Sequence, residues 1–358
     1  MLSPEQLDRD LAIRDLTDPA TGPHAIQLIV DDLVGALARR WGCEVRWCRG
    51  DRVVSIADNY DNLGYDPAAV TRDARYTRYV DANRVLRSHS SAMIPPALRA
   101  LAADPADDVL LVCPGIVYRR DSIDRLHTGT PHQLDLWRIS RKPLAPLKDM
   151  IEALVGDAEH RVDPRTHPYT VDGLQVDIVH NGEWVEVAEC GLAHPAVLAR
   201  AGLGTSWRGL AMGLGLDRML MLRKGIPDIR ILRSGDPQML DLLPYRPTST
   251  MPSITRDISV AVDSDDLAED LGDRVRDAVG DDCVESVEIV QETPCAELPP
   301  RALERLGARA DQKNLLVRIV LRRLDRTLSD TEANVLRDRV YAAVHRGTAH
   351  QWAAGPRS

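Results

Sequence analysis

Hydrophobic and polar residues follow different spacings along the first part of the chain. Between residues 22 and 41, apolar side chains recur every three or four positions, which predicts an amphipathic helix. Residues 108–113 are almost continuously apolar and predict a buried strand, which resumes at residues 116–118 after Pro114-Gly115. This pattern predicts helices packed on a sheet, and it puts Arg119 at a strand end beside the interior.

A second apolar segment contains Gly213 and Gly215, near the point where the predicted strand gives way to a helix. Residues 209–218 predict a strand that leads into a helix, with Asp217 as its cap and Gly225 as its end. Arg218 then lies in the first turn of an otherwise apolar helix. The segment lacks the third glycine of the dinucleotide fingerprint and the GK[ST] of a phosphate loop, so neither motif applies.

Residues 174–180 and 183–188 flank Asn181-Gly182, a strong signal for a two-residue hairpin turn. Counting outward from the turn puts Asp177 opposite Glu186. Like charges that face each other across a sheet are destabilising, so a cation is expected near them. Magnesium carried by ATP would supply one, and a lysine or arginine from elsewhere in the fold is the alternative.

Three prolines among small polar residues predict a linker at residues 244–252. Beyond it, the patterns predict a strand at 256–262, a helix at 267–279, and strands at 284–290 and 314–324. Ser329 and Glu332 form a capping box that opens a last helix, ending near residue 345. This β-α-β-β-α order predicts a ferredoxin-like domain.

Composition limits the class of protein. The chain has 358 residues, which favours two domains, and no apolar run approaches the roughly 18 residues of a membrane span. Acidic residues near the N-terminus and six scattered cysteines favour a cytoplasmic protein with reduced thiols. A net charge of −9 argues against indiscriminate nucleic-acid binding. The C-terminal region nevertheless gathers basic residues that predict an RNA-binding face, with a solvated charged face as the alternative: Arg301, Arg305, Arg309, Lys313, Arg318, Arg322, Arg323, Arg326, Arg337, Arg339 and Arg346.

The densest polar segment is residues 117–135, which reads VYRRDSIDRLHTGTPHQLD. A guanidinium held at a strand end needs an anionic partner, and arginine matches phosphate bidentately. A nucleotide is therefore the favoured ligand of Arg119 and Arg218, and a structural Arg–Asp pair is the alternative for either residue alone.

Taken together, these segments resemble the class II aminoacyl-tRNA synthetases, in particular the single-chain phenylalanyl form. The resemblance is carried by Tyr118-Arg-Arg-Asp121 with His127 and His132-Gln-Leu-Asp135 as motif 2, and by Gly213-Leu-Gly-Leu-Asp-Arg218 as motif 3. The loop Leu86-Arg-Ser-His-Ser-Ser91 resembles the substrate-side loop of the family, and Glu186 with Cys190-Gly191 resembles the strand before motif 3.

The resemblance implies an α+β protein. Its catalytic domain, residues 1–243, is expected to be an antiparallel sheet with flanking helices, and residues 253–358 to be a ferredoxin-like anticodon-binding domain. The implied activity is ATP-dependent activation of an amino acid, with phenylalanine favoured, and its transfer to tRNA. ATP and Mg²⁺ are the implied cofactors, tRNA is expected to bind the C-terminal domain, and the chain is expected to be a monomer or homodimer without membrane contact.

The resemblance also assigns site residues. Arg119 and Arg218 are the expected catalytic residues, binding ATP phosphates together with His127 and Glu186. Glu186 is also the metal candidate that the resemblance supports, and Asp177 is a second candidate because of its predicted pairing with Glu186. The expected amino-acid site is formed by residues that match family positions or lie near them: His89, Ser91, Asp121, Gln133, Asp135, His167, Tyr169, Leu174, Gln175 and Glu189.

The side-chain pocket departs from the family. His167-Pro168-Tyr169 stands where the family has Phe-Pro-Phe, Leu174 replaces a small residue that gives the ring room, and Glu189 replaces a glycine. These changes fit either another amino acid, including a noncanonical one for biosynthesis, or a rebuilt phenylalanine pocket. A tRNA-binding paralogue without catalysis is a further alternative, which the intact arginines disfavour.

The chain contains no phenylalanine. One hypothesis is selection for a synthetase that is translated without its own product, as a resistance or back-up copy. Drift in a GC-rich genome and a substrate other than phenylalanine are the alternatives.

Overall fold

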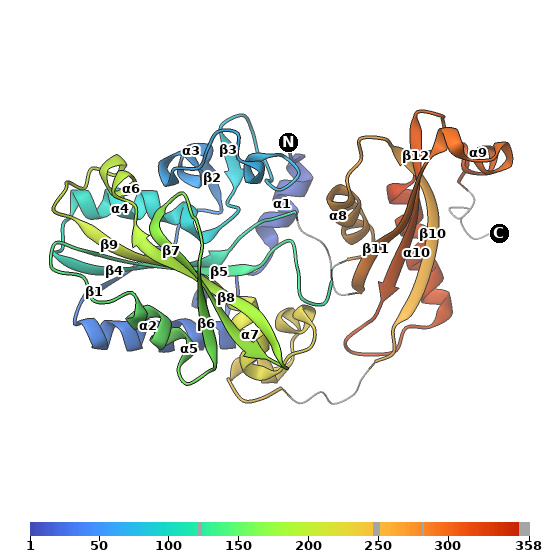
Figure 1. Cartoon of the computed structure of the whole chain (residues 1–358). Coiled ribbons are helices and arrows are strands. Elements are labelled where there is room, and N and C mark those ends of the chain that lie inside the picture. Colours follow the sequence, from blue (N-terminus) through green and yellow to red (C-terminus); the bar gives the residue numbers. More distant parts are fainter. Residues whose placement is uncertain (121–123, 246–250, 281–282, 351–358) are drawn as a thin grey trace. The chain divides into compact units, whose positions relative to one another are not determined.

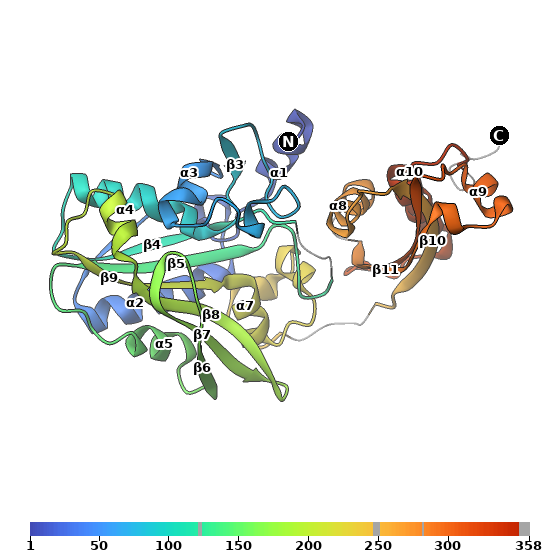
Figure 2. The same cartoon turned by 45° about the horizontal axis from the view of Figure 1, so that its top comes forward.

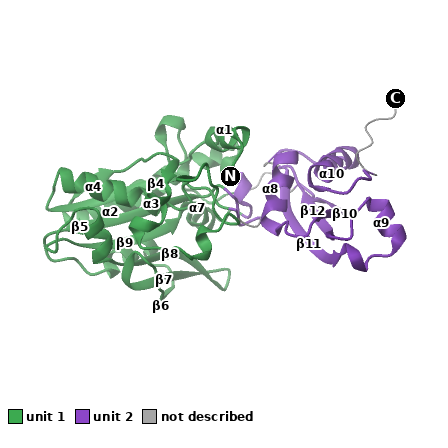
Figure 3. Ribbon diagram, turned by 90° about the horizontal axis from the view of Figure 1, so that it is seen from above, with its two compact units in different colours: residues 1–119, 130–226, 232–245 green, residues 120–129, 227–231, 246–358 purple. Residues whose placement is uncertain are grey.

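The computed structural model describes all residues except 121–123, 246–250, 281–282 and 351–358. It divides into two compact units, coloured in Figure 3. The first unit comprises residues 1–119, 130–226 and 232–245, and the second comprises residues 120–129, 227–231 and 246–358.

A seven-stranded sheet forms the centre of the first unit (Figure 1). Every neighbouring pair in it is antiparallel except β1 and β4, which are parallel. Across the sheet, the strands are β1 (Glu44–Trp47), β4 (Asp108–Ile116), β5 (His132–Ser140), β9 (Arg208–Gly215), β8 (Glu183–Ala193), β7 (Thr170–His180) and β6 (His160–Pro164). A separate two-stranded sheet pairs β2 (Val53–Ser55) with β3 (Arg84–Leu86).

Helices cover both faces of the large sheet. Figures 1 and 2 show α4 and α6 over one face and α2 and α5 over the other. The helices of this unit are α1 (Pro4–Ala12), α2 (Ala25–Trp41), α3 (Ile56–Asn59), α4 (Ile94–Ala103), α5 (Lys148–Val155), α6 (Pro195–Arg200) and α7 (Leu216–Lys224). Short 3-10 turns lie at Pro19–Thr21, Asp61–Leu63, Val70–Arg72, Ser90–Met93, Ile229–Arg233 and Pro237–Leu240.

Strand alternation separates two sets of side chains. Leu111, Trp137 and Ala211 are paired across β4, β5 and β9 and pack with residues of α4 and α6 in one buried cluster. Leu136 and Met212, one position along, point to the opposite face. We call the face that carries Trp137 the site face. On this face, the apolar cluster is followed along β5 by the carboxylate of Asp135, two residues before Trp137.

The second unit is built on the three-stranded sheet β10-β12-β11. Its elements are β10 (Ile254–Asp263), α8 (Ala268–Val279), β11 (Val284–Pro294), α9 (Pro300–Leu306), β12 (Gln312–Leu321) and α10 (Asp330–Val344), with a 3-10 turn at Cys295–Glu297. The predicted β-α-β-β-α order is confirmed, with α9 added. Ser329 and Glu332 form the predicted capping box at the start of α10.

Local predictions in the first unit have mixed outcomes. The helix predicted at 22–41 is confirmed as α2, and the turn is confirmed by positive φ angles of 51° at Asn181 and 82° at Gly182. Strand β4 runs through Pro114-Gly115 without interruption. The prediction that Asp217 caps α7 is wrong, because the helix begins at Leu216 and the Asp217 carboxylate accepts hydrogen bonds from His132 instead.

A buried ion pair inside the first unit leads to a stability prediction. Arg138 on β5 donates two hydrogen bonds to Asp108 on β4, at 2.9 and 2.8 Å, and its guanidinium lies 4.7 Å from the ring centre of Trp41. Arg138→Met should lower the free energy of unfolding by about 3–5 kcal/mol, because it leaves Asp108 buried without its partner. Chemical denaturation measures this loss. The control Arg84→Met, which breaks an exposed pair with Asp81, should change stability by less than about 1 kcal/mol.

Candidate active site

The centre of the site is a row of side chains across four strands of the site face. Strand register aligns Asp135 on β5, Gly213 on β9, Glu189 on β8 and Gln175 on β7. The space above the glycines is open: a Cβ at Gly213 would lie within 4 Å only of the Asp135 carboxyl group, and one at Gly215 would meet nothing. The strand between the two carboxylates is therefore a floor against which a flat ligand fits.

Asp135 is the most deeply buried carboxylate of the row. Its Oδ2 accepts hydrogen bonds from the hydroxyls of Ser90 at 2.5 Å and Ser91 at 3.1 Å, and its Oδ1 accepts one from the indole of Trp137 at 3.2 Å. Burial raises the pKa of Asp135 to about 6 despite these donors. A cationic group placed beside it would restore the ionised form.

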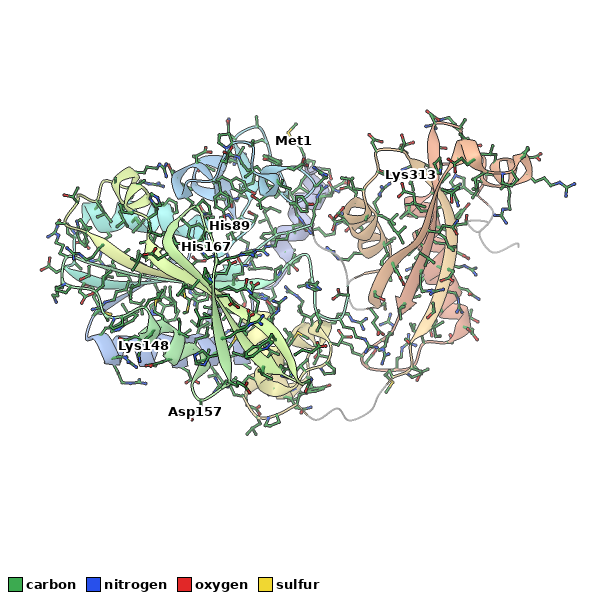
Figure 4. The ribbon with its side chains drawn as sticks, viewed as in Figure 1. Met1, His89, Lys148, Asp157, His167 and Lys313 are labelled. Carbon is green, nitrogen blue, oxygen red and sulfur yellow. The ribbon has the colours of Figure 1, made fainter. Side chains whose placement is uncertain are left out.

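Aromatic side chains surround this carboxylate. His89 stacks on Tyr65 with ring centres 5.5 Å apart, and Tyr65 in turn lies 6.2 Å from Tyr169. Tyr169 also lies 6.2 Å from Trp137 and stacks on His167 at 5.7 Å. His89 and His167, both labelled in Figure 4, are thus linked through the two tyrosines. Burial lowers the pKa of His89 to about 3, so this ring is neutral.

Glu189 forms a charged group at the other side of Gly213. Its carboxylate lies 3.2 Å from Nε2 of His167 and 3.6 Å from Nε of Arg165. Partial burial opposes its ionisation, yet the contacts with His167 and Arg165 hold the pKa of Glu189 below its usual value. Glu189 is therefore an anion in the free protein.

Two arginines border the row. Arg119, three residues after β4, donates from Nε to the carbonyl oxygen of Ser88 at 3.0 Å, and its charge favours the ionised form of Glu189. Arg218 lies in the first turn of α7 and donates to the carbonyl oxygen of Glu186 at 3.1 Å. Since these bonds go to backbone carbonyls and not to carboxylates, both guanidinium groups keep their charge available for an anion.

The carboxylates of the hairpin have different surroundings. The predicted pairing of Asp177 with Glu186 is confirmed by the register of β7 and β8. Arg161 on β6 donates two hydrogen bonds to Asp177, at 2.9 and 2.7 Å, and Gln175 donates a third. The arginine alternative thus accounts for Asp177. Burial and the charge of Glu189 raise the pKa of Glu186, which fits a carboxylate that gains from a nearby cation.

The structure brings most of the predicted amino-acid residues together: His89, Ser91, Gln133, Asp135, His167, Tyr169, Gln175 and Glu189. Gln133 joins the group by accepting a hydrogen bond from the Ser90 amide at 3.1 Å. Leu174 does not join it, because its register partner Cys190 lies in the row of Met212, on the opposite face. His127 belongs to the second unit, where its Nδ1 bonds to Asp124, and Asp121 lies outside the described residues.

Sequence reasoning missed three residues of the site. Ser90 makes the shortest bond to Asp135 and stands beside the predicted His89 and Ser91, so the loop itself was a signal. Trp137 lies two positions after Asp135, and strand alternation places it on the same face. Tyr65 has no local signal, because its place depends on a loop that folds back onto the sheet.

Within the part of the chain that the structure describes, no helix has the length and apolar character needed to cross a membrane. The site itself combines an antiparallel floor, two arginines with free charge and a carboxylate cage lined by aromatic rings. Such a site fits a nucleotide together with a small zwitterion, and it is typical of a nucleotide-using enzyme built on an antiparallel sheet.

Comparison with known proteins gives the family. The family described as the class II core domain of tRNA synthetases (F) matches residues 10–243. The phenylalanine--tRNA ligase alpha subunit of Prochlorococcus marinus (strain MIT 9313) is 32% identical over 238 residues, which are 63% of this chain and 69% of that protein. That of Acinetobacter baumannii (strain AYE) is 35% identical over 199 residues, 52% of this chain and 58% of that protein. The chain belongs to the class II aminoacyl-tRNA synthetase family, whose members use ATP and Mg²⁺ in general.

Proposed function

We propose that this chain activates phenylalanine as an aminoacyl-adenylate and transfers it to tRNA. The observation that carries the proposal is the buried Asp135, held by two serines beside aromatic rings and the open floor at Gly213. An α-ammonium group requires such an acceptor, and an aromatic side chain gains from such walls. The names of the similar proteins support phenylalanine as the amino acid.

The mechanism follows from the charges of the site. Activation joins the substrate carboxylate to the α-phosphate of ATP and releases pyrophosphate, so negative charge gathers at the reacting centre. Arg119 and Arg218 stabilise that charge and hold the phosphates, while Asp135 with Ser90 and Ser91 orients the ammonium group. Magnesium bound with ATP would neutralise part of the phosphate charge. Glu186 would be the protein ligand of that ion, since Asp177 is already paired with Arg161.

Asp135 gives the reaction a defined pH dependence. Its pKa of about 6 lies above the ordinary value of 3.8, so in the free protein Asp135 adds stability at low pH that is lost as pH rises through 6. The ammonium group binds the ionised form. The KM for the amino acid should therefore be constant above about pH 7 and rise up to about tenfold per pH unit below 6. Pyrophosphate exchange at saturating ATP measures this, and a sloping profile that persists in Asp135→Asn would assign the titration to another group.

The second unit is proposed to bind the anticodon arm of tRNA. Several of its basic residues are engaged in ion pairs, namely Arg309, Lys313, Arg318, Arg322, Arg326 and Arg337. Arg301 and Arg305 on α9 are exposed and have no acidic partner within 4 Å among the described residues. Their charge is available to meet RNA phosphates.

The double variant Arg301→Glu/Arg305→Glu should weaken tRNA binding by about tenfold or more at low salt, since it replaces two attractive charges by repulsive ones. Amino-acid activation should not change, because it needs no tRNA contact. Filter binding at two salt concentrations and pyrophosphate exchange measure the two effects. Unchanged tRNA affinity would remove α9 from the interface.

A charging assay tests the proposed function. The purified chain is incubated with ATP, Mg²⁺, phenylalanine and total tRNA, and the tRNA-bound amino acid is identified after mild alkaline release. Phenylalanine esterified to tRNA is the expected product. Activation without any transfer would favour the second candidate, a ligase that makes an adenylate for a biosynthetic pathway, which the charged residue Glu189 at the pocket supports. The same preparation, sized by light scattering, tests the proposal that one chain, alone or as a homodimer, is sufficient.

A further inference from the structure

Glu189 has no role in the reaction proposed above, yet it faces the same open floor as Asp135. The two carboxylates occupy one row of the site face, on the two strands that flank β9, with Gly213 between them. Because neighbouring strands are about 4.8 Å apart, their Cα atoms are separated by roughly 10 Å. One ligand lying across Gly213 reaches both carboxylates.

A ligand that lies along this row has to offer hydrogen-bond donors to both carboxylates, Asp135 and Glu189. Glu189 is held in its ionised form by His167 and Arg165, and its charge contributes to the raised pKa of Asp135. An α-ammonium group satisfies Asp135 alone. A plain hydrocarbon ring beside Glu189 would displace water from that carboxylate and give it no hydrogen bond, which is unfavourable.

His167, which contacts Glu189, also has an unsatisfied ring nitrogen. His167 is buried, and its Nδ1 is hydrogen-bonded to Thr170 at 3.0 Å. Its Nε2 lies 3.2 Å from Glu189 but is not aligned for a hydrogen bond, and it has no other partner among the described residues. The Glu189 side chain keeps 29% of its surface exposed. Glu189 and His167 thus form a polar group at one end of the site, and the Glu189 carboxylate can still accept hydrogen bonds.

Between the two polar ends, the walls are aromatic. Tyr169 lies between Trp137 and His167, at 6.2 and 5.7 Å from their ring centres, and Tyr65 continues the wall toward His89. Such walls favour a ring in the middle of the ligand over a flexible charged chain.

From this arrangement, and resting on the proposed function, we propose that Glu189 determines specificity. The preferred substrates are aromatic amino acids that carry a hydrogen-bond donor on the ring, such as a hydroxyl or amino group, and phenylalanine is used less efficiently. The α-ammonium group binds Asp135, the ring lies over Gly213 between the aromatic walls, and the ring donor binds the Glu189 carboxylate.

The test compares substrates that differ only at the far end of the ring. We would measure kcat/KM in ATP–pyrophosphate exchange for phenylalanine, tyrosine, 4-aminophenylalanine and 4-methoxyphenylalanine. Tyrosine or 4-aminophenylalanine should exceed phenylalanine by at least about tenfold, the order expected when one hydrogen bond to a charged group is gained. The methoxy compound, which has the size but no donor, should not exceed phenylalanine.

Glu189→Gln provides the matched variant, because it keeps the shape of the side chain and removes its charge. It should reduce the preference for the donor-bearing substrate over phenylalanine at least about fivefold, mainly through the KM for the donor-bearing substrate. The inference is overturned if the wild type prefers phenylalanine to both donor-bearing substrates, or if the preference persists in Glu189→Gln. The wild-type comparison decides alone if the variant does not fold. Absence of exchange with every amino acid would instead overturn the proposed function.

Discussion

Arg218→Ala is expected to lower the rate of amino-acid activation by about 10²–10³-fold, which corresponds to roughly 3–4 kcal/mol of transition-state stabilisation. The reason is the position of the side chain in the first turn of α7, where its only hydrogen bond within the described residues goes to the backbone carbonyl of Glu186. The guanidinium charge is thus left for the phosphates. ATP–pyrophosphate exchange at saturating amino acid and ATP measures kcat directly.

Arg223→Ala on the same helix is the matched control. Arg223 is exposed, and its ion pair with the exposed Asp32 is long, at 3.5 Å. Its removal should therefore leave both activation and the thermal midpoint of unfolding nearly unchanged. If Arg218→Ala retained more than a tenth of wild-type activity while remaining folded, Arg218 would not be a phosphate ligand.

Arg119→Ala is expected to cause a loss of similar size. Arg119 is anchored through Nε to the Ser88 carbonyl, in the loop that also supplies Ser90 and Ser91 to Asp135. Its removal deletes a phosphate partner and loosens that loop, so kcat should fall and the KM for ATP should rise. Initial rates over a matrix of ATP and amino-acid concentrations separate the two effects.

Arg119→Lys distinguishes charge from geometry. Lysine keeps the positive charge but loses the planar pair of donors that holds Ser88 and a phosphate at once. We expect activity between those of the wild type and Arg119→Ala. Equal activity of the lysine and alanine variants would mean that bidentate geometry, and not charge, is the essential property; wild-type activity in both would exclude Arg119 from the reaction.

Local signals in the sequence predicted much of the fold. The period of apolar residues identified α2, the Asn181-Gly182 turn set the register of β7 and β8 from His180 to Asp177, and the capping box placed the start of α10. In each case, the structural outcome depends on residues that are close in the chain.

The site required information that is not local. A count outward from the Asn181-Gly182 turn would pair Leu174 with Glu189, but an irregularity between Val176 and Asp177 pairs it with Cys190 instead, and the sequence gives no signal of that irregularity. Tyr65 lies in the segment between β2 and β3, and its ring meets His89 and Tyr169, which are distant from it in the chain. The partner of Asp177, by contrast, was one of two alternatives, and only the position of Arg161 on β6 decided in favour of the arginine.

The proposed activity is tested most directly by ATP–pyrophosphate exchange with the purified wild-type chain and no tRNA or other protein. We expect label to enter ATP in the presence of phenylalanine or a ring-substituted phenylalanine, and incorporation to fall to background in Arg218→Ala. Exchange that depends on no amino acid, or that is equally fast in Arg218→Ala, would contradict the assignment of this site to amino-acid activation.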